Sequence, residues 1–173
     1  MPNNYDIFVQ SIAIISLVIF ALSYQSRTRK RILLINIVGI IVLIAHYLLL
    51  KAWTGAVINI LNAIFAICFV LREKYEWLNT RILLYCALMI LVLGTIYSWE
   101  AFYSIFALLG VLLMTISRWQ GDTQKLRLIA VLASLAWITY DYFAGSIGGI
   151  VLECFILLSL FISIFRNKQS SKN

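Results

Sequence analysis

Three polar residues, Asn59, Asn62 and Glu153, stand inside long apolar runs, and two aromatic residues, Trp137 and Tyr140, stand in another. Amides and a carboxylate form hydrogen bonds and aromatic rings stack, so together these side chains could hold a polar organic molecule. A charge in hydrocarbon is costly, and Glu153 therefore needs a wet cavity or a partner. We interpret the five residues as a substrate-binding site for a small polar solute.

Each of these residues also has a purely structural interpretation. Asn59 and Asn62 could join helices by hydrogen bonds, and a protonated Glu153 could bond to a neighbouring helix. His46 and Asp141 stand near the ends of two apolar runs, where we expect them to line an outer entrance. His46 could equally serve as an interfacial anchor.

Catalysis is a weaker interpretation of the same sequence. Ser146 and His46 could form the nucleophile and base of an intramembrane hydrolase, but the spacing is G-S-x-G and the chain has one histidine. Cys68, Cys86 and Cys154 all fall in apolar runs, where free cysteine behaves as a small apolar residue. We therefore expect no enzyme, no cofactor and no metal site.

Composition indicates which elements position these residues. The 173 residues are 63% hydrophobic and 12% charged, against about 25% charged in ordinary soluble domains. Because about 20 apolar residues form a membrane-spanning helix, the chain reads as a single all-α polytopic membrane domain, 1–173. The expected spans of its seven transmembrane helices are 7–23, 33–50, 53–71, 82–99, 101–117, 128–143 and 147–165.

The basic residues indicate the orientation of these helices. Thirteen of the fourteen fall on one side of the predicted spans, and Lys51 alone falls on the other. Cytoplasmic loops carry the excess of Lys and Arg, so the pattern predicts an outside N-terminus and a cytoplasmic C-terminus. The net charge of +7 then reflects topology and contact with the lipid bilayer, and we expect no nucleic acid as a partner.

Sparse identities indicate an internal repeat. Aligning Gln25 with Gln120 gives an offset of 95, which pairs His46 with Asp141, and an offset of 94 after the next outer loop pairs Asn59 with Glu153. The predicted units are a first three-helix repeat at 7–74, a linker helix at 82–99 and a second three-helix repeat at 101–168. Parallel repeats of this 3+1+3 kind place a substrate site near their interface.

Two stretches carry a resemblance to a known family. "WITYDYFAGSIGGIVLECFILL", and "HYLLLKAWTGAVINILNAI" followed by "LREK", resemble the YgjV family of bacterial inner-membrane proteins (Imp-YgjV). The likeness covers nearly the whole chain and implies a multi-pass protein of the bacterial cytoplasmic (inner) membrane.

The 3+1+3 plan is more remotely similar to SWEET and PQ-loop transporters. Gln25 and Gln120 fall at the PQ-like positions, without the proline. Since proline hinges are ascribed to SWEET transporters, glycines are expected to supply hinges or close packing here, namely Gly55, Gly145, Gly148 and Gly149. Asparagines line the SWEET sugar site, whereas Glu153 in one matching position suggests a cationic or proton-coupled solute.

The sequence thus predicts a small-solute transporter or facilitator with a polar site between the two repeats. The alternative is a non-transporting membrane protein that binds a protein partner through its basic cytoplasmic loops. Because one chain holds both repeats, either a monomer or a homo-oligomer fits.

Overall fold

The computed structural model describes residues 4–72 and 74–170, and over these residues it is entirely helical. It has seven α-helices and one short 3-10 helix, η1 (Glu76–Leu78). The α-helices are α1 (Asn4–Gln25), α2 (Arg29–Leu50), α3 (Trp53–Leu71), α4 (Arg81–Tyr97), α5 (Ser104–Trp119), α6 (Thr123–Ala144) and α7 (Ile147–Ser170). The expected all-α class with seven helices is therefore confirmed.

Five of the helices, α1, α2, α3, α6 and α7, are long and apolar enough to cross a membrane. The other two are apolar but shorter, with 17 residues in α4 and 16 in α5, which corresponds to about 25 Å at 1.5 Å per residue. The helix expected at 101–117 begins only at Ser104. Its hydroxyl accepts the N–H groups of Glu100 and Ala101, which fold the preceding residues into a turn.

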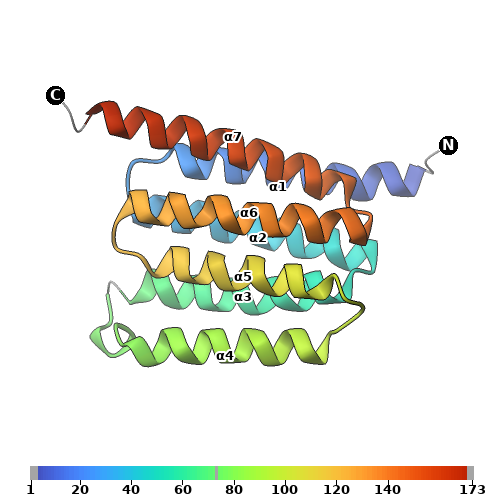
Figure 1. Cartoon of the computed structure of the whole chain (residues 1–173), viewed down its shortest axis with the longest axis horizontal. Helices are drawn as coiled ribbons and strands as arrows, with labels where there is room; N and C mark the ends of the chain where they lie inside the picture. The colour runs from blue at the N-terminus through green and yellow to red at the C-terminus, as the bar shows by residue number, and fades with distance from the viewer. Residues whose placement is uncertain (1–3, 73, 171–173) are drawn as a thin grey trace.

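The helices form two layers with α4 at one edge (Figure 1). One layer contains α1, α2 and α3, and the other contains α7, α6 and α5. Across the layers α1 packs on α7 and α3 packs on α5, while α4 packs on both α3 and α5. The central helices α2 and α6 lie between these pairs, so the middle of the bundle is enclosed by six helices.

The connections between the helices lie at the two ends of the bundle. We call the end that contains the α1–α2, α3–α4 and α5–α6 connections the basic end. At the other end, which we call the opposite end, α2 and α6 stop in the same way. Lys51 and Gly145 follow them in the left-handed region, at φ 61° and 71°. This conformation reverses the chain directly into α3 and α7.

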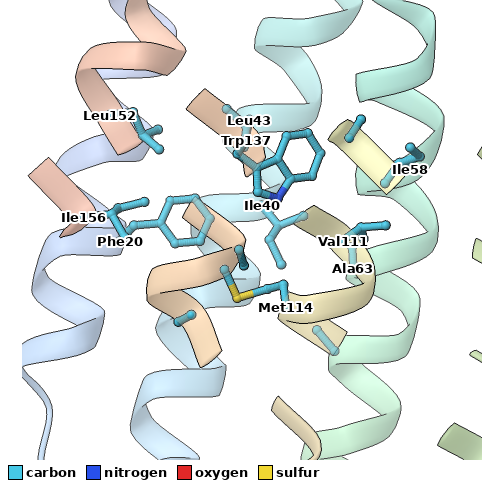
Figure 2. Close-up of a cluster of buried hydrophobic side chains, with 14 of the residues drawn as sticks. Phe20, Ile40, Leu43, Ile58, Ala63, Val111, Met114, Trp137, Leu152 and Ile156 are labelled. Carbon is cyan, nitrogen blue, oxygen red and sulfur yellow. The ribbon is translucent and has the colours of Figure 1, made fainter. Parts of the chain in front are cut away.

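Apolar side chains fill most of the interior. Figure 2 shows the rings of Phe20 and Trp137 in the middle of a buried cluster that also contains Ile40, Leu43 and Met114. An added Cβ at Gly110 would lie 2.8 Å from two atoms of the Trp137 indole. The missing side chain at Gly110 is therefore what allows the indole to lie this close to α5.

Candidate functional site

Four of the five predicted substrate-binding residues line one cavity in the middle of the bundle. Asn59, Asn62, Trp137 and Glu153 share it with seven other side chains, Phe20, Tyr24, Ile40, Leu43, Met114, Arg118 and Ile156. All six helices other than α4 contribute to the lining. Its free volume is about 20 Å³, which is room for about one water molecule. The free space in the cavity is therefore much smaller than an organic solute.

Arg118 is the first of two polar residues of this cavity that sequence reasoning missed. Only 2% of its surface is exposed, although it is the penultimate residue of α5. Helical side chains lean toward the amino terminus of their helix, so Arg118 extends back into the bundle. One terminal nitrogen donates a hydrogen bond to the Asn62 side-chain oxygen. Its Nε has no hydrogen-bond partner.

Glu153 lines the same cavity and is also incompletely paired. It is 6% exposed, and its Oε2 has no hydrogen-bond partner. The Ser134 hydroxyl lies beside this carboxylate, and its oxygen also has no hydrogen-bond partner. Asn59, across the cavity, donates its amide to the Gly55 carbonyl at 2.9 Å. Within the described part of the chain, no ion pair joins Arg118 to Glu153.

Tyr24 is the second lining residue that sequence reasoning missed. It is completely buried, and its hydroxyl donates to the Met114 sulfur at 3.6 Å. It lies close enough to both Arg118 and Glu153 to interact with them electrostatically. The cavity therefore holds one cationic, one carboxylic and one phenolic group.

The remaining predicted binding residue, Tyr140, lies outside the cavity lining. Its hydroxyl oxygen accepts the Gly55 N–H at 2.9 Å. That bond ties α6 to the start of α3, and Gly55 lets the two approach, because an added Cβ would lie 2.9 to 3.0 Å from Tyr47 and Tyr140. The structure therefore gives Tyr140 a position between helices.

His46 and Asp141, expected at an outer entrance, belong to a buried network at the opposite end. Tyr47 donates to Asp141 at 2.8 Å, and His46 Nε2 lies 2.8 Å from the Ser146 hydroxyl. His46 Nδ1 donates to the Val9 carbonyl at 2.9 Å, so a neutral imidazole accepts from Ser146. Since none of these residues is more than 1% exposed, they form a closed end of the bundle.

The contact between Ser146 and His46 also bears on the hydrolase interpretation. The Ser146 oxygen accepts the Gly149 N–H at 3.1 Å, which is the bond of an N-terminal helix cap on α7. Both Ser146 and His46 have no exposed surface, so no substrate reaches the hydroxyl in this conformation. The geometry supports a cap that also links α7 to α2.

Four arginines close the basic end of the bundle. Arg72 donates to the Trp119 carbonyl and Arg166 donates to the Gln25 carbonyl, at 2.8 and 3.0 Å. Three further bonds at this end run from Arg29 to the carbonyls of Gln120 and Arg118, and from Arg127 to that of Ser26. Cations at the carboxyl ends of helices are favourable because they offset the helix dipole. These bonds join α2 and α3 to the end of α5, and α6 and α7 to the end of α1.

The other predicted positions serve packing and capping. Gln25 donates to Ser159 on α7, and Gln120 donates within its own helix to Ile116. Gly145 caps α6, and Gly148 approaches α1, where an added Cβ would lie 2.8 Å from Ala13 and from the Gln10 carbonyl. In the described residues no group of three His, Cys, Asp or Glu side chains could hold a metal ion.

The lining residues of the cavity show a regular spacing in the sequence. Ten of the eleven fall into pairs exactly 94 residues apart, and Ile40 is the eleventh. The pairs are Phe20 and Met114, Tyr24 and Arg118, Leu43 and Trp137, Asn59 and Glu153, and Asn62 and Ile156. In each pair one residue comes from α1–α3 and the other from α5–α7.

Comparison with known proteins gives one match. The family model of Imp-YgjV, described as a bacterial inner membrane protein, matches residues 7–171, which confirms the resemblance to that family. No curated protein and no solved structure matches the chain. The remoter resemblance to SWEET and PQ-loop transporters stays a prediction.

Proposed function

The chain belongs to the Imp-YgjV family of bacterial inner membrane proteins, and we propose that in this membrane it is a small-solute transporter or facilitator. Its solute site is the central cavity, between a first unit of α1–α3 and a second unit of α5–α7, with α4 as the link. The observation that carries this proposal is the cavity itself, which is lined by both units and holds the buried polar side chains of Asn59, Asn62, Arg118 and Glu153. Polar residues inside a membrane are costly and typically mark solute pathways.

The spacing of 94 residues supports the two-unit description. Helices α1, α2 and α3 end at Gln25, Leu50 and Leu71, and the first two of these positions plus 94 give the ends of α5 and α6. The turn bonds repeat at the same spacing, since Ala52 N–H to Tyr47 carbonyl corresponds to Ser146 N–H to Asp141 carbonyl.

This spacing revises the alignment made from identities alone. An offset of 94 applies from α1 onward, so Tyr47 corresponds to Asp141, and His46 does not. Gln25 then corresponds to Trp119, which removes the pairing of Gln25 with Gln120. The bonds of Arg72 to the Trp119 carbonyl and Arg166 to the Gln25 carbonyl become equivalent. The hydrogen bond from Tyr47 to Asp141 joins two equivalent positions, as expected for residues close to a two-fold axis.

The proposed mechanism is a rocking of the two units about the cavity. In the orientation that the positive-inside rule favours, the basic end faces the cytoplasm. Opening that end breaks the arginine bonds to helix carboxyl ends, and opening the other end breaks the Tyr47–Asp141 and His46–Ser146 bonds. Each set consists of a few polar contacts, which can be exchanged for contacts with water when that end opens. The described conformation is then the occluded state between the two open ones.

A ligand screen with a matched pair of variants tests the proposal. The thermal stability of the purified protein is measured against a solute library for wild type, Glu153→Gln and Glu76→Gln, of which Glu76 lies in η1 and is exposed. A ligand at 100 times its dissociation constant adds about 2.7 kcal/mol. We expect a stabilising solute whose effect is lost in Glu153→Gln and kept in Glu76→Gln.

Other outcomes contradict the cavity assignment. A solute that stabilises wild type and both variants equally binds elsewhere. A protein that no solute stabilises, and whose cellular role survives Glu153→Gln but not replacement of exposed Arg27, Lys30 and Arg31, acts through a partner at the basic end.

A further inference from the structure

We propose that the solute is a small organic zwitterion, whose anionic group pairs with Arg118 and whose cationic group pairs with Glu153. This inference rests on the proposed function, because it names the class of molecule that the central cavity takes. It follows from the pairing, position and sequence spacing of the two charged residues.

The anionic group of the solute is inferred from Arg118. A guanidinium stays protonated in proteins, so this side chain carries its charge into the centre of the bundle. Its bond to the neutral Asn62 side chain leaves that charge uncompensated, and its Nε has no partner. A carboxylate is the planar acceptor that matches such a fork of N–H donors.

Arg127 is a second buried arginine in the same protein, and the negative end of a helix compensates its charge. It is also completely buried and also retains unpaired nitrogens. However, it donates to the carbonyls of Tyr24 and Ser26 at the carboxyl end of α1, the negative pole of that helix. Arg127 does not line the central cavity. Arg118 instead donates to the Asn62 side chain and lines the cavity.

The cationic group of the solute is inferred from Glu153. Its Oε2 is buried and lacks a donor. Asn59, which lines the same cavity, donates to the Gly55 carbonyl, and the neighbouring Ser134 hydroxyl forms no hydrogen bond. An ammonium group would give this oxygen a charge-assisted donor, and the Trp137 ring in the same lining offers a face to a cation.

The two charges are separated along the bundle. Arg118 is near the carboxyl end of α5, toward the basic end, whereas Glu153 is the seventh residue of α7, which starts at the opposite end. They form no ion pair, yet both interact electrostatically with Tyr24. A neutral solute would give neither side chain an ionic partner, and a singly charged solute would give a partner to one of them. A zwitterion that bridges them neutralises both.

Both charged residues of the cavity belong to the second unit, α5–α7, and the first unit has no charged residue at the matching positions. The residues 94 positions before Arg118 and Glu153 are Tyr24 and Asn59, which are neutral and line the same cavity. The charges therefore break the similarity of the two units and leave one favoured orientation for a dipolar solute. The apolar lining, which includes Phe20 and Leu43 (Figure 2), suits a short carbon chain between the two charged groups.

Binding of matched four-carbon probes to the purified protein tests the inference. The probes are 4-aminobutyrate, butyrate, butylamine and butyramide, which differ only in their charged groups, together with the shorter and longer ω-amino acids from glycine to 5-aminovalerate. We expect at least one ω-amino acid to bind more tightly than its singly charged analogues by about tenfold or more, since a hydrogen bond to a charged group contributes about 1.5 kcal/mol or more. The chain length that binds best reports the separation between the two charges.

Two variants test which side chain binds each charged end of the probe. In Glu153→Gln, which keeps the shape of the side chain, the ω-amino acid should bind no better than the corresponding carboxylic acid. In Arg118→Met it should bind no better than the corresponding amine. If Arg118→Met fails to fold, Glu153→Gln alone still decides, because it isolates the contribution of the ammonium group.

The inference is overturned if butyrate binds as well as 4-aminobutyrate, if butylamine does, or if no ω-amino acid binds. These outcomes do not by themselves refute the proposed function. A library solute of another class that needs Glu153 would refute the zwitterion and leave the solute site in place.

Discussion

Replacing Arg118 by methionine is expected to make the empty protein more stable. The change removes a buried guanidinium whose bond to a neutral side chain leaves its charge uncompensated, and it fills nearly the same space with an apolar chain. The sign is unusual, because most substitutions of buried residues destabilise a protein. It follows from a site arranged for a ligand that is absent.

The magnitude combines two opposing contributions. Arg118 is the penultimate residue of α5, but its side chain extends back into the bundle. The cost of an arginine at the centre of a transmembrane helix, about 2.5–3.5 kcal/mol on insertion scales, is therefore the most that its removal recovers. The lost bond to Asn62 contributes about 0.6 kcal/mol, as hydrogen bonds between transmembrane helices do on average. We therefore expect Arg118→Met to raise the free energy of unfolding by about 1–3 kcal/mol without solute.

The assay is reversible unfolding in mixed micelles, with Arg127→Met as the matched control. Arg127 is equally buried but ties α6 to the carboxyl end of α1 through the Tyr24 and Ser26 carbonyls. Arg127→Met should therefore be destabilised. If Arg118→Met loses as much stability as Arg127→Met, then Arg118 is a structural tie and the reasoning for an uncompensated charge fails.

Two further substitutions have defined outcomes. Tyr47→Phe removes the donor to the buried Asp141 carboxylate and should lower the free energy of unfolding by about 0.6–1.7 kcal/mol in the same assay. Tyr142→Phe, at an exposed position, should change stability little. Equal effects of the two substitutions would contradict the network at the opposite end. Asp122 accepts the N–H groups of Lys125 and Gln124 at the start of α6, which lowers the pKa of its carboxyl below the usual 3.8. Its stabilising effect is therefore present above pH 3.8 and disappears as the pH falls through the lowered pKa, so melting temperatures of Asp122→Ala and wild type should differ at neutral pH and converge in acid. A difference that persists in strong acid would rule out the charge of Asp122 as the cause.

The sequence alone was sufficient to predict the helices and three of the five polar residues that line the cavity. Asn59, Asn62 and Glu153 stand out because polar side chains are rare inside apolar runs. Arg118 and Tyr24 stand near the ends of runs, where basic and aromatic residues usually mark topology and the membrane interface. What distinguishes them is the direction of the side chain, which depends on the helix that carries it and on the neighbours it meets.

In the proposed two-unit description the offset over the first part of the chain is 94, one residue less than the identities alone suggested, for a related reason. In a chain so rich in leucine and isoleucine, a few identities fit two neighbouring offsets almost equally well. The left-handed residues Lys51 and Gly145 and the turn bonds beside them fix the helix ends. Such backbone geometry is shared by residues of unlike type, so it leaves little trace in an alignment by identity.

The most direct test of the central claim is whether the cavity opens to both sides of the membrane. Leu43 lines the cavity, whereas Leu91 on α4 is equally apolar, completely buried and outside it. Each is changed to cysteine in a protein whose Cys68, Cys86 and Cys154 have been replaced, and a membrane-impermeant thiol reagent is applied to spheroplasts and to inverted vesicles. A transporter predicts that Leu43→Cys reacts from both sides and Leu91→Cys from neither. If Leu43→Cys reacts from neither side, or from one side only, the cavity is not a transport pathway.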